Sequence, residues 1–204
     1  MSGQPSVPVV FLHGRGLGPD SAATVAPAFP GVPLLMPQGG VGLRRGHTWF
    51  ENERIGVARA DSVAAAEARF LTWCEEGPLS GRAAWLCGFS NGGAFAAHLL
   101  MRHPDRFRGA ALLSAPLVLP PWPDGGMRGK PVLYVHGDEA DTVVGPAFYA
   151  SAEAYLAGLA ECIPVIRHLP IGHMVTPEVV DELGRWFTAV RSSVPIPNAE
   201  QFIG

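Results

Sequence analysis

Apolar residues along the chain gather in short, uninterrupted runs that are separated by segments with helical spacing. The runs have the length of β-strands and cover Val7–Leu12, Val32–Met36, Ala83–Gly88, Ala110–Leu113, Val132–Val135 and Val165–Leu169. Strands that are apolar at nearly every position are buried on both faces, as in a parallel sheet covered by helices. The pattern therefore predicts a central, mostly parallel β-sheet.

Four segments between these runs predict helices. The first is Val57–Glu76, in which Val63, Phe70 and Cys74 recur at helical spacing. The others are Asn91–His103, Ser151–Ala160 and Pro177–Val190. Strands that alternate with helices predict a doubly wound α/β fold with helices on both faces of the sheet. We expect a single domain over residues 1–190 and a C-terminal tail over 191–204.

Composition and charge narrow the classes of partner. The chain has 204 residues, of which 48% are hydrophobic, and its net charge is −3. This length supports a core without disulfides or metals, and the charge argues against bulk electrostatic binding of nucleic acid or of an anionic membrane. We expect a small-molecule substrate and no nucleic-acid or membrane partner. A positive mean hydropathy of +0.18 leaves a monomer and a homodimer both open.

The cysteines and the N-terminal residues bear on the compartment. Cys74, Cys87 and Cys162 are odd in number and form no C-x-x-C pair, which argues against a disulfide framework and against a zinc site. The first ten residues lack the basic start and long apolar stretch of a secretion signal. The sequence therefore predicts a cytoplasmic protein without a disulfide framework or a zinc site.

A G-x-S-x-G pentapeptide is the first sign of chemistry. Gly88-Phe89-Ser90-Asn91-Gly92 directly follows a strand-like run and directly precedes a helix-like run. In that context the serine lies on a tight strand-to-helix turn, with the helix N-terminus directed at it, and the flanking positions must be small. The motif predicts Ser90 as a nucleophile, and without catalytic partners it would be only a glycine-rich turn.

Candidate partners follow in the order acid, then histidine. An acidic loop after Val132–Val135 offers three carboxylates, Asp138, Glu139 and Asp141, and His173 follows the next strand-like run. The remaining histidines are less suited by placement. His98 and His103 lie on a helix, His136 fits a structural turn residue, and His168 lies inside a strand-like run with its side chain expected to point away from the strand tip.

An oxyanion-binding loop is predicted after the first strand. A tetrahedral intermediate needs two N–H donors, which come from the residue after the nucleophile and from the loop after an early strand. These are the backbone N–H groups of Asn91 and of Arg15, the latter in Phe11-Leu12-His13-Gly14-Arg15-Gly16. A phosphate-binding loop is the competing interpretation, but GxGxxG and the P-loop lysine are both missing.

These motifs together resemble the α/β-hydrolase fold, and within it the phospholipase/carboxylesterase family that includes the acyl-protein thioesterases. The resemblance runs from about Val9 to about Val190 and rests on FLHGRG, on MPQGG followed by HTWF, and on GFSNGGAFA, VHGDEADTVV and LPIGHMV. It implies a cofactor-free hydrolase of esters or thioesters. It also implies Ser90 as nucleophile, His173 as base and Asp141, rather than its two neighbours, as acid.

The chain departs from the family pattern at Arg15, Asn91, Glu51 and Thr142, and these departures bear on the substrate. Arg15 beside Arg44, Arg45 and His47 would attract an anionic substrate, although solvated surface arginines are the simpler interpretation. Trp49, Phe50, Leu117 and Trp122 are candidates for an apolar substrate pocket, and ordinary core packing would explain each aromatic equally well. The short, proline-rich Ser114–Lys130 segment predicts that no cap domain covers the cleft.

The sequence therefore predicts a serine hydrolase that cleaves short- to medium-chain or small soluble carboxylic esters through an acyl-enzyme. Thioesterase, lysophospholipase, lactone hydrolase and acyl transferase activities use the same three side chains and stay open. A non-catalytic relative that only binds a small molecule is the alternative outside enzymes.

Overall fold

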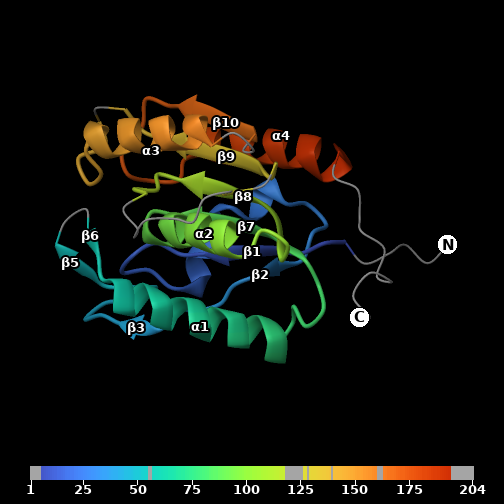
Figure 1. Ribbon diagram of the computed structural model, residues 1–204. Helices are drawn as coiled ribbons and strands as arrows, with labels where there is room; N and C mark the ends of the chain where they lie inside the picture. Colours follow the sequence, from blue (N-terminus) through green and yellow to red (C-terminus); the bar gives the residue numbers. More distant parts are fainter. Residues whose placement is uncertain are drawn as a thin grey trace.

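A six-stranded sheet forms the centre of the molecule. The structure is a computed structural model that describes residues 6–54, 57–117, 126–127, 129–138, 140–159 and 163–193. The strand order is β10-β9-β8-β7-β1-β2, every neighbouring pair is parallel, and the order can be followed from top to bottom in Figure 1. The strands are β1 (Val9–Leu12), β2 (Leu34–Leu35), β7 (Ala84–Phe89), β8 (Phe107–Leu113), β9 (Pro131–His136) and β10 (Ile163–His168). The predicted parallel sheet is confirmed.

All four predicted helices are present, with shifted ends. They are α1 (Ala60–Glu76), α2 (Asn91–Arg102), α3 (Pro146–Gly158) and α4 (Pro177–Ser193). The prediction started the first helix too early, because Val57–Ala58 forms a short strand, β6, that pairs with β5 (Asn52–Arg54). It started the third too late, because Pro146 occupies the first turn of α3, where a missing N–H costs nothing. Helix α4 also extends past residue 190, and 194–204 lie outside the described residues.

Several short elements were not predicted. Strands β3 (Val41–Gly42) and β4 (His47–Thr48) form a small antiparallel pair, and two 3₁₀ helices cover Pro19–Thr24 and Ala26–Ala28. Elements of two to six residues carry too few positions to show a hydrophobic period.

Two apolar layers cover the two faces of the sheet. On one face, Val10 and Leu12 of β1 belong to the cluster that includes the buried residues of α1, α2 and α3. On the other, Val9 and Phe11 join the cluster that contains α4 and the 3₁₀ helices. Strands that look uniformly apolar in the sequence therefore alternate between two cores, as expected for a doubly wound sheet.

The parallel direction of the strands gathers the predicted site residues. Arg15 follows β1, Ser90 follows β7, Asp141 follows β9 and His173 follows β10. Because carboxyl ends of parallel strands lie at one edge of the sheet, the loops that carry these residues meet there.

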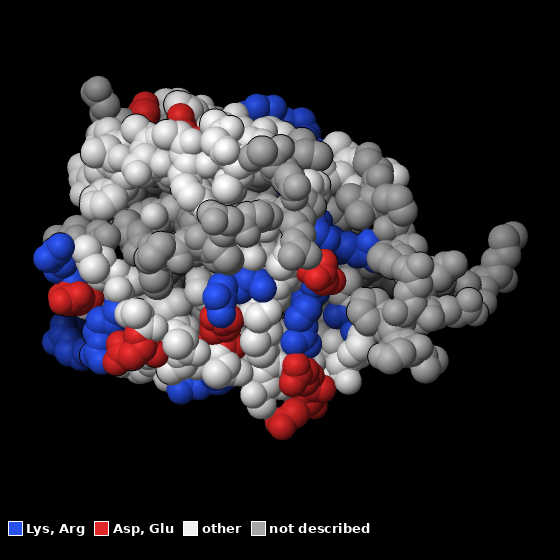
Figure 2. Space-filling model, viewed as in Figure 1, with Lys and Arg blue, Asp and Glu red and all other residues white. Residues whose placement is uncertain are grey.

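Charged residues of both signs lie side by side on the face shown in Figure 2, mostly over its lower part. Arg106 pairs with Glu75, and Arg59 pairs with Glu51 and Asp61. Among the helices in the described ranges, none is both long and apolar enough to cross a membrane.

Candidate active site

Ser90 occupies the sharp turn between β7 and α2. Its backbone angles, φ 53° and ψ −119°, lie in a region that non-glycine residues rarely adopt, which indicates stored strain. The turn is tight enough that a Cβ on Gly88 would lie 2.3 Å from the Gly92 carbonyl oxygen, and one on Gly92 would lie 2.1 Å from the Leu12 carbonyl oxygen. Both flanking positions therefore require glycine, and the serine is held at the start of the helix.

The side chains of Ser90, His173 and Asp141 form one hydrogen-bonded chain. The Nε2 atom of His173 lies 2.9 Å from the Ser90 Oγ, and the Nδ1 atom lies 2.9 Å from the Asp141 Oδ2. The His173 ring packs against Phe89 at 5.0 Å between ring centroids. This arrangement places a base beside the hydroxyl and an acceptor behind the base, which is the geometry of nucleophile activation.

Asp141 is buried and fully engaged. Its Oδ1 accepts hydrogen bonds from the N–H groups of Val143 and Val144, each at 2.9 Å, and its Oδ2 accepts from the Tyr149 hydroxyl as well as from His173. Burial acts to raise the pKa of the Asp141 carboxyl, but these hydrogen bonds outweigh it and hold the pKa below its ordinary value. The carboxylate therefore stays ionised and can stabilise a protonated His173.

The acidic loop offered two other carboxylates, and the structure describes one of them, Asp138. Asp138 is exposed, and its side chain accepts a hydrogen bond from the Ala140 N–H. Glu139 lies outside the described residues. Of the described candidates, only Asp141 contacts His173.

Arg15 and Asn91 meet at the same cavity as Ser90. Within the described part of the chain, neither backbone N–H has a hydrogen-bond acceptor, so both are free to donate to a ligand. The Asn91 side chain has a further role that the sequence did not indicate. Its Oδ1 accepts from the Thr48 hydroxyl at 2.8 Å and from the Trp49 N–H at 3.0 Å, which ties the start of α2 to the loop after β4.

His13 supports the loop that carries Arg15. Its Nε2 accepts the Gly39 N–H at 2.9 Å, its Nδ1 lies 2.9 Å from the Gly14 carbonyl oxygen, and its own carbonyl accepts the Trp49 indole N–H. Burial lowers the pKa of His13 below its ordinary value. A neutral ring, with its proton on Nδ1, satisfies both contacts.

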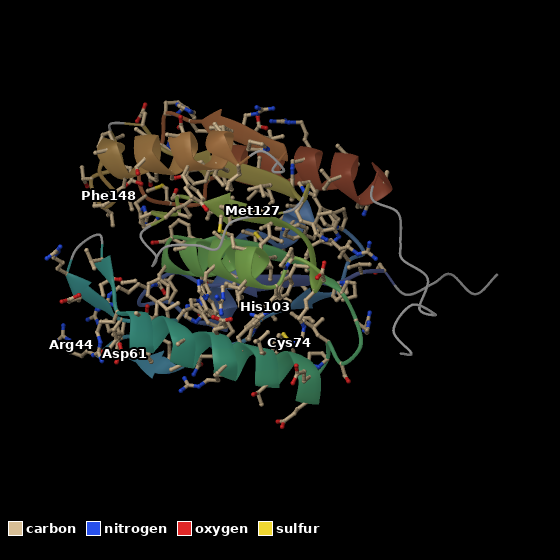
Figure 3. All side chains as sticks on the ribbon, viewed as in Figure 1. Arg44, Asp61, Cys74, His103, Met127 and Phe148 are labelled. Atoms are coloured by element: carbon tan, nitrogen blue, oxygen red, sulfur yellow. The ribbon has the colours of Figure 1, made fainter. Side chains whose placement is uncertain are left out.

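A cavity of about 510 Å³ opens beside Ser90. Its lining comprises Arg15, Leu43, Phe50, Glu51, Asn52, Arg54, Ser90, Asn91, Ala94, Pro116, Val143, Val144 and Phe148. Figure 3 shows Phe148 at the start of α3, on the side that faces β5 and β6. This volume suits a small ligand.

The predicted pocket residues lie in different environments. Phe50 lines the cavity, whereas Trp49 is core, 4% exposed and stacked on Phe95 at 5.2 Å between ring centroids. Leu117 packs against the core cluster, and Trp122 lies outside the described residues. Trp49 is therefore a core residue, and its assignment to the pocket is corrected, because an apolar residue near a site and one in the core look alike in sequence. Pro116, next to Leu117, lines the cavity.

The predicted basic rim is also corrected. Arg15 lines the cavity, but Arg44 and Arg45 do not, and Arg54 takes their place. Glu51, which shares the lining, pairs with Arg59 at 3.1 Å, and this pair reduces the effect of its negative charge.

Comparisons with known proteins bear on the fold and its family. No family model and no curated protein matches the sequence. A carboxylesterase from Mesorhizobium loti superposes with a TM-score of 0.81 at 26% identity, covering 89% of this chain and 88% of that one. The chain has the α/β-hydrolase fold. The predicted resemblance to the phospholipase/carboxylesterase family is thereby confirmed, and the match extends over nearly the whole α/β-hydrolase chain.

Two further solved structures share the fold of this α/β-hydrolase. The Bacillus cereus carboxylesterase superposes with a TM-score of 0.80 at 19% identity and covers 92% of this chain and 90% of its own. SOBER1 from Arabidopsis thaliana superposes with a TM-score of 0.73 at 19% identity and covers 90% and 98%. At this level of identity the two superpositions show the shared fold.

Sequence reasoning missed several contributors to the site. Tyr149 and the Val143 and Val144 N–H groups hold Asp141, and Phe148 and Leu43 line the cavity. The sequence indicated only that the acid lies in the loop after the strand-like run Val132–Val135. Nothing in the pattern singled out these residues, because their roles depend on the three-dimensional path of the loop.

Proposed function

We propose that the protein is a serine esterase that cleaves carboxylic esters of short to medium acyl chain. The observation that carries the proposal is the hydrogen-bonded chain from Asp141 through His173 to Ser90, which opens on a cavity lined by two free N–H groups. The carboxylesterase neighbours support the same class of reaction.

In the proposed mechanism, His173 takes the Ser90 proton on Nε2 as the Oγ attacks the carbonyl carbon of the ester. The N–H groups of Arg15 and Asn91 stabilise the resulting oxyanion. His173 then returns the proton to the departing alcohol, which leaves an acyl-enzyme. Water that His173 deprotonates hydrolyses this intermediate, and Ser90 recovers its proton as the acid departs.

The cavity supports a modest substrate size. About 510 Å³, with Leu43, Phe50 and Phe148 among its apolar residues, suits a short to medium acyl chain or a small alcohol group better than a long lipid chain. Thioesters, lactones and lysophospholipids present the same carbonyl to the same three side chains, so they are further substrates to compare.

The test is hydrolysis of p-nitrophenyl esters from acetyl to dodecanoyl. We expect turnover by the wild type with an optimum below the longest chains, and none above background for Ser90→Ala. Ser80→Ala, at an exposed loop serine, is the matched control and should retain the wild-type rate. Turnover that persists in Ser90→Ala would contradict the proposal.

We further propose that the substrate carries a negative charge away from the scissile ester. Arg15 and Arg54 are both exposed residues of the cavity lining, and the carboxylate of Glu51 is paired with Arg59. A guanidinium at the rim would orient a carboxylate or phosphate group of the substrate.

A further inference from the structure

A second cluster of functional side chains lies at the ends of β9 and β10. His136 and His168 are the last residues of these strands and are partners in the parallel register. Both Nε2 atoms face the Oε1 atom of Glu153 on α3, at 2.5 Å and 2.8 Å. The three candidate ligand atoms lie within 4.8 Å of one another. His168, for which the sequence indicated no functional role, joins this cluster.

A backbone carbonyl next to His136 can set the ring tautomer that a metal ligand needs. The Nδ1 atom of this ring lies 2.6 Å from the Gly137 carbonyl oxygen, so an acceptor faces each ring nitrogen. A neutral imidazole carries a single N–H. When the Nδ1–H donates to the Gly137 carbonyl, the neutral ring presents the lone pair of Nε2, which a cation can bind. Histidines that bind metals commonly make this second contact, which fixes their tautomer and ring orientation.

The ring of His136 is held in place before any ion binds. It is 4% exposed and stacks on the Tyr149 ring with a centroid distance of 4.3 Å and an interplanar angle of 17°. The His168 side chain is 60% exposed, and that of Glu153 is 26% exposed. One ligand is therefore fixed in the interior, while the other two are accessible to solvent and hence to an ion.

The cluster around Glu67 is an ion-pair cluster of the same residue types, and it differs from the cluster around Glu153. Glu67 on α1 also receives two histidines, His98 and His103, each at 2.7 Å, but on different carboxylate oxygens. Arg102 adds a permanent positive charge 3.5 Å from the same carboxylate. A guanidinium at this position satisfies the carboxylate and repels a cation. Figure 3 shows His103 of this cluster between α2 and α1.

We propose that His136, His168 and Glu153 bind one divalent transition-metal cation of the zinc type. Two imidazole nitrogens and one carboxylate oxygen suit Zn²⁺ or Co²⁺, whereas Ca²⁺ and Mg²⁺ prefer oxygen ligands alone. The bound cation would link β9, β10 and α3. None of the three ligands is among the described residues that line the cavity at Ser90, so the site serves structure rather than the ester chemistry.

The test uses tag-free protein dialysed against chelator and then titrated with Zn²⁺ or Co²⁺. We expect one ion per chain, a cobalt absorption spectrum typical of nitrogen and oxygen ligands, and a rise in melting temperature with zinc. His168→Ala and Glu153→Gln should weaken the zinc affinity on the order of 10- to 100-fold. Both change side chains with solvent access, so the fold does not depend on them as it does on the buried His136.

Two variants serve as controls. His103→Ala removes a histidine from the Glu67 cluster and should bind zinc as the wild type does, and so should Ser90→Ala, which separates this proposal from the esterase proposal. Equal affinities in His168→Ala and the wild type would overturn the site, as would a loss of binding in His103→Ala. Absence of saturable binding up to about 1 mM zinc would do the same, since affinity that weak fits an adventitious ion only.

Discussion

The two halves of the candidate site are held in different ways. On the side of the nucleophile, α2 is buried at every residue except Arg102, and backbone segments approach so closely that Gly88 and Gly92 leave no room for a Cβ. On the side of the acid and base, α3 buries only Tyr149, Ala152 and Leu156. Hydrogen bonds to Asp141 and ring stacking around His136 determine the geometry there.

Substitutions on the two sides of the site should therefore have different effects. Steric exclusion fixes the position of Ser90, so added volume should disturb folding on that side. On the side of the acid and base, polar partners fix Asp141 and His173. Loss of a hydrogen bond there should change the ionisation of Asp141 and the catalytic rate more than it changes folding.

Replacing the proposed acid should have the largest effect on rate. Asp141→Asn keeps the shape but favours the wrong tautomer of His173, and we expect kcat to fall on the order of 10⁴-fold. Asp138→Asn is the matched control, because this exposed carboxylate contacts the Ala140 N–H and not His173. Ester hydrolysis by the two variants is the measurement, and a larger loss in Asp138→Asn would reassign the acid.

A methyl group at the turn should affect folding. A Cβ on Gly92 would lie 2.1 Å from the Leu12 carbonyl oxygen, so Gly92→Ala is expected to cost about 3 kcal/mol of stability or more. Gly172→Ala lies next to His173, where a Cβ would be 3.5 Å from the Ala140 carbonyl oxygen, an ordinary contact. Urea unfolding should show a large loss for the first variant and a small change for the second. Equal losses of unfolding free energy in the two variants would contradict the proposed difference between the two sides of the site.

Loss of the Tyr149 hydroxyl should act through the ionisation of Asp141. Tyr149→Phe removes one hydrogen bond to a charged group, worth about 1.5–3 kcal/mol. The folded-state pKa of Asp141 lies below its unfolded value, so its ionisation stabilises the fold above about pH 4 and this contribution is lost as the pH falls.

Because Tyr149→Phe raises the folded-state pKa of Asp141 towards its ordinary value, the stability gap to the wild type should be full near neutral pH and shrink on acidification. Unfolding curves between neutral and acidic pH measure this gap. A gap that is independent of pH would mean that the hydroxyl acts by packing alone.

The smallest expected effect concerns substrate charge. Arg54→Gln should lower kcat/KM for an ester with a distal carboxylate by no more than about fivefold relative to a neutral ester, because exposed charge pairs are weak. Arg44→Gln is the control, since Arg44 is exposed but does not line the cavity. If the ratio of kcat/KM for the charged ester to kcat/KM for the neutral ester is unchanged in both Arg15→Gln and Arg54→Gln, the proposed selection for substrate charge is wrong.

The same contrast explains how far the sequence could be interpreted. The sheet and four helices were predictable because strands such as β7 are apolar on both faces and α1 repeats apolar residues at helical spacing. The turn at Ser90 was predictable because its steric demands admit only glycine at two nearby positions. The three predicted side chains do meet in one hydrogen-bonded chain, and their catalytic roles remain our proposal.

The acid side was harder to predict. Three carboxylates in one loop are equivalent in a sequence, and the choice of Asp141 depended on family resemblance. The physical reason for that choice lies in the donors from Val143, Val144 and Tyr149, which only the folded loop brings together. Trp49 was misassigned for a similar reason, since its indole N–H is satisfied by the His13 carbonyl inside the core.

The central claim is that Ser90 is the nucleophile, and covalent labelling tests it most directly. The protein would be treated with a fluorophosphonate, and the intact mass and the labelled peptide would be determined for the wild type and for Ser90→Ala. The account predicts one adduct per wild-type chain, on Ser90, and none in Ser90→Ala. An adduct on another residue would contradict this claim. So would full esterase activity in protein whose Ser90 carries the label.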